Sequence, residues 1–174
     1  MNGNVIGQAL TAVSYPAYYS ARLFKKKSSI IKMQCFSSSI TVASFVALGS
    51  YDGVSSTIFS LVGNFVGGFV EKRKQLVKIA CFIPLFLVMI AMYSADFQGI
   101  STIMIGASMF LNVFGIVFLN PQGIRICTMI GSVFYFLFQF LIGNYVGLVL
   151  EVGTFLINLV TLIKYKGAYK VEEV

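Results

Sequence analysis

The sequence predicts an all-α polytopic membrane protein with seven transmembrane helices, arranged as two parallel three-helix repeats joined by a connecting helix. Three observations predict this fold class. Hydrophobic residues make up 57% of the 174 residues and charged residues only 11%, roughly half the charge of a typical water-soluble domain. The apolar residues gather in seven runs, each close to the roughly twenty residues that a helix needs to cross a bilayer. All basic residues fall at alternate breaks between these runs.

The first three runs form the predicted first repeat, residues 4–70. The run 4–23 ends at a lysine cluster, 30–49 ends at a GSYDG turn, and 52–70 ends at EKRKQ. Charged residues are costly in lipid and glycine favours turns, so these clusters mark helix ends. A single span at 76–94 then connects the two repeats.

The next three runs form the predicted second repeat, residues 99–165. Its runs are 99–119, 124–142 and 145–164, separated by NPQG and GNYVG. Every break in the chain is short, so each connection is expected to be a helical hairpin within one membrane domain. Residues 166–174 follow as a polar tail.

The charges indicate how the chain lies in the membrane. Lys and Arg in short loops stay on the cytoplasmic side, and all thirteen fall on one side of the seven predicted spans. We therefore expect the amino terminus outside and the carboxyl tail in the cytoplasm. The alternative is a six-span chain with one re-entrant segment. The basic residues are Arg22, Lys25, Lys26, Lys27, Lys32, Lys72, Arg73, Lys74, Lys78, Arg125, Lys164, Lys166 and Lys170.

The composition also narrows the function. The basic residues that give the net charge of +7 are explained by the orientation of the chain in the membrane, so we expect no nucleic-acid partner. The same basic residues at the cytoplasmic face should attract anionic lipids. The chain has no His, the usual general base and a common metal ligand. Its three Cys residues form no CxxC pattern. We therefore expect no enzyme, catalytic residue, metal site or cofactor.

An internal repeat appears when the chain is shifted by 94 residues against itself. The GSYDG turn at 49–53 then falls on the GNYVG turn at 143–147, and one intramembrane Asn falls on another. Because three helices reverse the side of the chain, the single connecting span makes the two repeats parallel. Parallel repeats are a recurrent plan of transporters, with the substrate site between them. The matched pairs are Gly49 with Gly143, Tyr51 with Tyr145, Gly53 with Gly147, and Asn64 with Asn158.

Two stretches of the chain, 14–64 and 143–165, resemble the YgjV family of bacterial inner-membrane proteins. The specific elements are the basic loop after the first helix, the LG-x-Y turn at 48–51, and the spacing of Gly147, Glu151 and Asn158. The resemblance implies a multi-pass protein of the bacterial inner membrane and carries no function. More distantly, the plan is similar to SWEET, PnuC and PQ-loop transporters, and Pro16 before the basic loop resembles the SWEET hinge.

Glu151 is the most specific candidate site residue, because it lies about six residues into the last span. A charged carboxylate there costs on the order of 2 to 3 kcal/mol, so it needs a partner, a proton or water. It is either a proton- or substrate-binding group facing the repeat interface, or a structural carboxyl bonded to another helix or reaching the outer interface.

Intramembrane amides are the other candidates. Asn158 follows Glu151 by seven residues, which is two turns and the same helix face, and Asn64 is its repeat partner. The pair either lines a central path or makes interhelical hydrogen bonds. Asn112, Gln8 and Gln139 could extend either role.

Two functions remain open at this stage. The first is transport of a small polar solute by alternating access, with Glu151, Asn64 and Asn158 at the central site and Pro16 as a hinge. The second is a non-transporting receptor, scaffold or assembly partner with its site in the loops. The expected partners are the lipid bilayer, anionic lipids at the cytoplasmic face, an unidentified small solute and, in a homo-oligomer, further copies of the chain.

Overall fold

The structure is a computed structural model that describes residues 3–95 and 97–165. Within these residues the chain forms seven α helices and no strand. Each helix begins and ends within three residues of its predicted run. The helices are α1 (Gly3–Leu23), α2 (Lys27–Leu48), α3 (Tyr51–Val70), α4 (Gln75–Ala95), α5 (Ile100–Phe118), α6 (Pro121–Leu141) and α7 (Tyr145–Lys164).

Two helices begin three residues earlier than predicted, at Lys27 and Pro121. At the second, the Asn120 side chain accepts a hydrogen bond from the backbone N–H of Gly123 at 2.9 Å, and Pro121 takes the first helical position, where its missing N–H costs nothing. The apolar run marks the part of each helix in lipid, while polar residues extend the helix beyond it.

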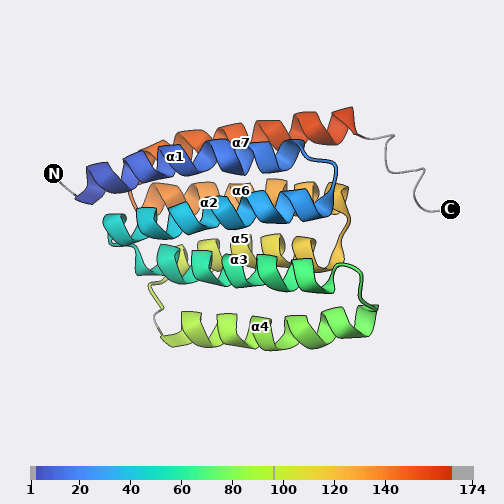
Figure 1. The fold of residues 1–174 in the computed structure, drawn as a ribbon. Helices are drawn as coiled ribbons and strands as arrows, with labels where there is room; N and C mark the ends of the chain where they lie inside the picture. Colours follow the sequence, from blue (N-terminus) through green and yellow to red (C-terminus); the bar gives the residue numbers. More distant parts are fainter. Residues whose placement is uncertain (1–2, 96, 166–174) are drawn as a thin grey trace.

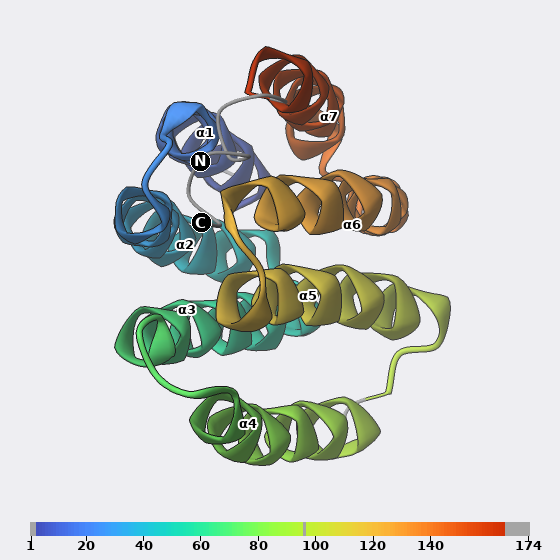
Figure 2. The same cartoon turned by 90° about the vertical axis from the view of Figure 1, so that its right-hand side faces the viewer.

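Six helices form a closed ring around a central axis. Following the contacts between helices, the order is α1, α2, α3, α5, α6, α7 and back to α1. Figures 1 and 2 show α1, α2 and α3 stacked beside α7, α6 and α5. The two stacks therefore meet at two seams, α1 against α7 and α3 against α5.

The connecting helix α4 lies outside the ring, against α3 and α5 (Figure 2). Phenylalanine rings of α4 contact those of α5 in edge-on and tilted pairs. Phe82 contacts Phe110 and Phe118, and Phe86 contacts Phe110. Aromatic pairs of this kind add stability beyond the area they bury. The helix thus braces one seam of the ring.

The seam between α3 and α5 is close because of two glycines. An added Cβ at Gly63 would lie 2.6 Å from Cγ2 of Val113, and one at Gly67 would overlap Ile116. The predicted packing role of this small-xxx-small spacing is consistent with these contacts.

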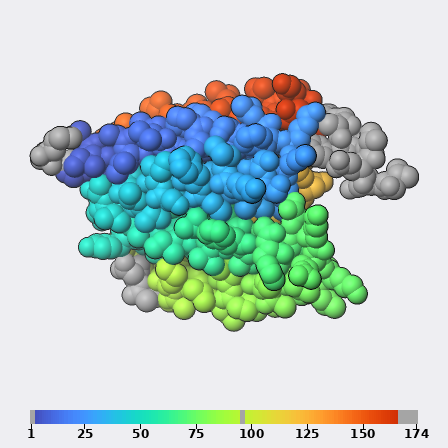
Figure 3. All heavy atoms as spheres, in the orientation of Figure 1, coloured from blue at the N-terminus to red at the C-terminus, as the bar shows by residue number. Residues whose placement is uncertain are grey.

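The outer surface is apolar, as lipid requires. Phe65, Phe69, Leu76, Val160 and Ile163 are each more than 60% exposed, and Figure 3 shows α1, α2, α3 and α4 covering one face in chain order. Six of the seven helices, α2 to α7, are long and apolar enough to cross a membrane. The remaining helix, α1, has 21 residues but carries polar residues that it buries inside the ring.

The described basic residues all lie at the end of the ring where α1, α3, α5 and α7 finish, to the right in Figure 1. Lys166 and Lys170 of the predicted tail, and Asp96, lie outside the described residues.

Candidate functional site

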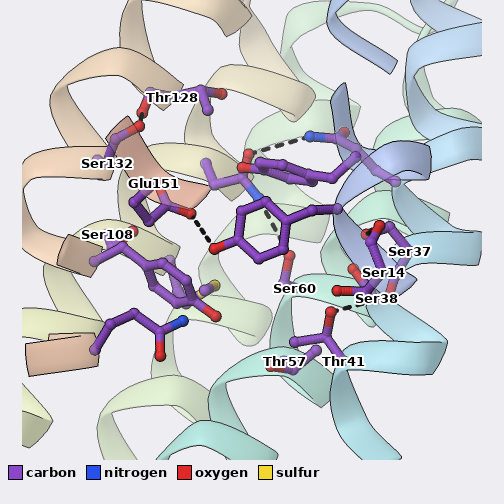
Figure 4. A pocket seen from close by; sticks show the side chains of 18 of the residues that line it. Ser14, Ser37, Ser38, Thr41, Thr57, Ser60, Ser108, Thr128, Ser132 and Glu151 are labelled. Atoms are coloured by element: carbon purple, nitrogen blue, oxygen red, sulfur yellow. Dashed lines mark hydrogen bonds between the residues drawn. The ribbon is translucent and has the colours of Figure 1, made fainter. Parts of the chain in front are cut away.

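A central cavity lies inside the ring of six helices. The space free of atoms amounts to about 710 Å³ only when the part open to its surroundings is counted. All six ring helices contribute side chains, and α4 contributes none. Figure 4 shows these side chains converging from opposite sides of the ring. They are Thr11, Ser14, Tyr15, Tyr18, Gln34, Ser37, Ser38, Thr41, Phe45, Thr57, Ser60, Ser108, Met109, Asn112, Thr128, Gly131, Ser132, Tyr135, Gln139 and Glu151.

The lining is polar although the chain is mostly apolar. Seventeen of these twenty residues carry a hydroxyl, amide or carboxyl group, and thirteen carry a hydroxyl. No Lys or Arg is among them, and the one carboxyl is that of Glu151. Buried polar surface in a membrane protein marks a solute or ion pathway more often than simple packing.

Glu151 joins the cavity to the seam between α1 and α7. Its side chain is 3% exposed, and its Oε1 accepts a hydrogen bond from the hydroxyl of Tyr15 at 2.7 Å (Figure 4). The Tyr15 hydroxyl also lies 3.4 Å from the Gly147 carbonyl oxygen. The carboxyl group is therefore bonded to a neighbouring helix and also lines the cavity, so its position is compatible with either role left open by the sequence.

Two of the predicted amides also line the cavity. Asn112 donates from Nδ2 to the Ser60 hydroxyl at 3.2 Å, across the seam between α5 and α3. Gln139 is 1% exposed, and its Oε1 has no hydrogen-bond partner within the described residues. An unpaired buried acceptor is costly, so this oxygen is a place where the protein supplies no donor of its own.

The asparagine pair does not line the cavity. Asn64 and Asn158 are both fully buried, and Asn158 donates from Nδ2 to the carbonyl of Thr154 in its own helix at 2.8 Å. Each follows a lining residue on the same face, Asn64 one turn after Ser60 and Asn158 two turns after Glu151. Both asparagines therefore lie beyond the cavity lining, nearer the basic end of the ring, where they are buried between helices.

Gln8 lies apart from the cavity as well. It is partly exposed near the start of α1 and donates to Oδ1 of Asn4 at 2.8 Å. Pro16 faces outwards in the middle of α1, which continues as a helix on both sides of it. The hinge role of Pro16 stays a prediction.

Buried arginines organise the basic end of the cavity. Arg22 is fully buried, and its guanidinium carbon lies 4.4 Å from the centre of the Tyr18 ring. With the Gln34 amide turned so that its oxygen faces Arg22, that oxygen accepts two hydrogen bonds at 3.0 and 2.9 Å. In the opposite orientation the Gln34 amide nitrogen donates to Asn112 at 3.4 Å but faces the Arg22 donors, so the first orientation is the favourable one.

A second buried arginine fixes the loop after α1. Arg125 of α6 donates from Nε to the Arg22 carbonyl at 3.2 Å and from Nη2 to the Phe24 carbonyl at 2.7 Å. These hydrogen bonds connect the first turns of α6 to the end of α1 and the loop that follows it.

Asn144 links helices towards the opposite end of the ring. This residue is fully buried, and its Nδ2 donates to the Thr11 hydroxyl at 3.2 Å. Thr11 in turn shares a hydrogen bond of 2.6 Å with Ser44. Polar contacts through Thr11 thus link α7, α1 and α2.

The two matched turns have the same local geometry. Gly49 and Gly143 have φ angles of 71° and 69°, a left-handed conformation that favours glycine. The following residues, Ser50 and Asn144, cap α3 and α7 by accepting a hydrogen bond from the N–H three residues later. Tyr51 and Tyr145 are 73% and 65% exposed, as expected for interfacial anchors.

The third matched pair makes the same type of contact in both halves. A Cβ at Gly53 would lie 2.6 Å from the Phe45 ring, and one at Gly147 would lie 2.8 Å from Cδ of Gln139. Phe45 and Gln139 are themselves 94 residues apart. Both glycines therefore allow a helix to approach a side chain of the cavity wall.

A family model described as bacterial inner membrane protein, Imp-YgjV, matches residues 5–168. The chain belongs to the Imp-YgjV family. This confirms the family predicted from the sequence and establishes an integral protein of the bacterial inner membrane. No curated protein and no solved structure matches the chain. The more distant similarity to SWEET, PnuC and PQ-loop transporters therefore stays a prediction.

Sequence reasoning missed most of the hydroxyl groups in this Imp-YgjV protein. On α6 the lining residues Thr128, Ser132, Tyr135 and Gln139 recur at spacings of three or four, which places them on one helix face. Gln34, Ser37, Ser38 and Thr41 do the same on α2. A polar stripe of helical period within an apolar run was the signal that could have found them.

Proposed function

We propose that this Imp-YgjV protein transports a small polar solute by alternating access between two triple-helix repeats, 4–70 and 99–165. The observation that carries the proposal is the polar cavity walled by all six ring helices. A purely structural bundle gains nothing from a space lined by hydroxyls and a carboxyl in the middle of a membrane. A transporter needs such a space between its moving halves.

The local geometry supports a pseudo-symmetric pair of repeats. The two left-handed glycines, the two side-chain caps and the two close glycine contacts each occur once per repeat, 94 residues apart. Exchange of the repeats also turns the α3–α5 seam into the α7–α1 seam, and both seams are present. Rocking of one repeat against the other would open and close these seams.

The contacts at the two ends support a cavity that is closed towards the basic end. Arg22, Tyr18 and Gln34 meet there, and Asn64 and Asn158 are buried beyond the cavity on the same helix faces. In the reverse state of the cycle, these asparagines would become part of the lining. This would restore to the pair the role that the sequence suggested.

The orientation we propose has the basic end in the cytoplasm, with the amino terminus outside. The eleven described Lys and Arg residues at one end support it, because basic short loops stay inside. It also requires α1 to cross the membrane, which its buried polar face permits when that face lies against the ring interior rather than lipid.

Solute entry into proteoliposomes tests the proposal. Vesicles with the purified protein are challenged with glycerol, ribitol, glucose and choline, and swelling is recorded by light scattering. Ser132→Trp would fill the cavity, whereas Val133→Trp, on the next residue, faces outwards with 52% exposure. We expect entry of at least one solute with wild type and Val133→Trp, and its loss with Ser132→Trp. Equal entry with both variants, or no entry with any protein, contradicts transport and favours the receptor or scaffold alternative.

A further inference from the structure

Two residues of the cavity wall have hydrogen-bond acceptors for which the described residues supply few donors or none. Gln139 Oε1 is buried and has no partner within the described residues. The Glu151 carboxyl group accepts a hydrogen bond from the hydroxyl of Tyr15 and interacts with that of Ser132, and a carboxylate accepts up to about four hydrogen bonds. An occupant that satisfies these atoms must bring N–H or O–H donors.

The cavity wall also contains an acidic group and no basic one. Glu151 is the acidic residue of the lining, and no Lys or Arg lines the space. The guanidinium of Arg22 attracts the Glu151 carboxylate electrostatically, but it contacts the Tyr18 ring and the Gln34 amide and does not line the space. A carboxylate removed from water strongly favours a cationic neighbour.

Aromatic rings complete the surroundings of the carboxylate. Tyr15, Tyr18, Tyr135 and Phe45 all line the cavity, and Tyr15 stands edge-on to Tyr18 with ring centres 5.9 Å apart. Aromatic faces attract organic ammonium groups, most strongly where water is excluded. A carboxylate among aromatic rings is therefore suited to an organic cation rather than to a bare metal ion, which prefers several charged oxygen ligands.

We infer that the cavity binds a small organic cation that carries at least one N–H or O–H donor. Its positive centre lies against Glu151 and the tyrosine rings, and its donor reaches Gln139. This inference rests on the proposed function only in taking the cavity to be open to solutes. It names the class of substrate that the transporter would carry.

Binding of matched cationic and neutral probes tests the inference. Full-length protein in detergent is titrated by calorimetry with choline and its neutral isostere 3,3-dimethyl-1-butanol, and with benzylammonium and benzyl alcohol. At least one cation is expected to bind about tenfold more tightly than its isostere. Similar affinities within both pairs, a preference for the neutral members, or no binding of either cation overturns the inference.

Two variants assign the preference to the cavity. Glu151→Gln keeps an acceptor for Tyr15 but removes the charge, so the preference for the cation should disappear. Asp52→Asn is the matched control, because Asp52 is the other buried carboxyl among the described residues and accepts from Thr102 at 2.9 Å outside the cavity lining. A cation preference that survives Glu151→Gln, or that is lost in Asp52→Asn, places the cation elsewhere and overturns the inference.

A measurement on the unchanged protein guards against a variant that fails to fold. Dicyclohexylcarbodiimide reacts with carboxyl groups inside membranes, and mass spectrometry reports the reaction at each residue. Choline is expected to slow labelling of Glu151 but not of Asp52, while 3,3-dimethyl-1-butanol protects neither. Equal protection by both probes contradicts the inference. Entry of glycerol or ribitol in the vesicle assay would still support transport, so the two failures are distinguishable.

Discussion

At the scale of single residues, the Glu151 and Tyr15 pair explains how the membrane interior accommodates a carboxyl group. The sequence identified Glu151 because one acidic residue within an apolar run stands out. Its partner could not be identified, because three tyrosines, Tyr15, Tyr18 and Tyr19, lie close together on the first helix and only the packing of α1 against α7 selects Tyr15.

Tyr15→Phe should destabilise the protein. The ring remains, but the hydrogen bond to Glu151 is lost, and a buried acceptor left unpaired costs about 1 to 3 kcal/mol. The measurement is the thermal unfolding midpoint in detergent. Tyr145→Phe, whose side chain is 65% exposed, is the control and should leave the midpoint unchanged. Equal midpoints for the two variants would show that the Tyr15 hydroxyl contributes nothing.

The hydroxyl groups show why residue type alone did not reveal the cavity. Ser132 donates to the carbonyl of Thr128, and Thr128 donates to that of Ile124, both within α6. Such local bonds are the ordinary explanation of hydroxyls in membrane helices. Here the same side chains also line the cavity, so the local bond does not exclude a functional role.

At the scale of helices, the lengths were predictable because the bilayer sets them. The ring order was not, since the sequence of apolar runs does not specify which helices meet across the seams. The asparagines illustrate the same limit. The spacing of Asn64 and Asn158 predicted the helix face on which they lie. How far the cavity extends along that face depends on the packing of Arg22, Tyr18 and Gln34, which the spacing does not reveal.

Gly67→Ala should weaken the α3–α5 seam. The added methyl group would overlap Ile116, which is fully buried, and overpacking of this kind typically costs about 1 to 3 kcal/mol. Gly68→Ala is the matched control, because its Cβ would lie 3.7 Å from Cγ2 of Ile31, an ordinary contact. Thermal unfolding in detergent compares the two variants. A lower midpoint for Gly68→Ala than for Gly67→Ala would be inconsistent with this seam.

At the scale of the whole molecule, charge and lipid explain the architecture together. The apolar outer faces require a membrane, and the basic residues gather at one end of the molecule, the end that we propose to lie in the cytoplasm. Only the inside of the ring departs from this pattern, which is why the polar cavity is the feature that calls for a function.

Reporter fusions test the proposed direction. Fluorescent protein or alkaline phosphatase is fused after Tyr165, at the end of α7. A cytoplasmic end predicts a fluorescent fusion and an inactive phosphatase. Fusions after Gly143, at the opposite end of the ring, serve as the control and should give the reverse pattern. Active phosphatase after Tyr165 would contradict the orientation.

The central claim is that the ring encloses a water-accessible path for a solute, and cysteine accessibility tests it most directly. In a chain with Cys35, Cys81 and Cys127 replaced by Ala, single cysteines are placed at Ser38, which lines the cavity, and at Ser39, which faces outwards on the same helix. A membrane-impermeant methanethiosulfonate is applied from each side of the vesicles. The account predicts labelling of Ser38→Cys and none of Ser39→Cys. No labelling of Ser38→Cys from either side, or equal labelling of both, would contradict it.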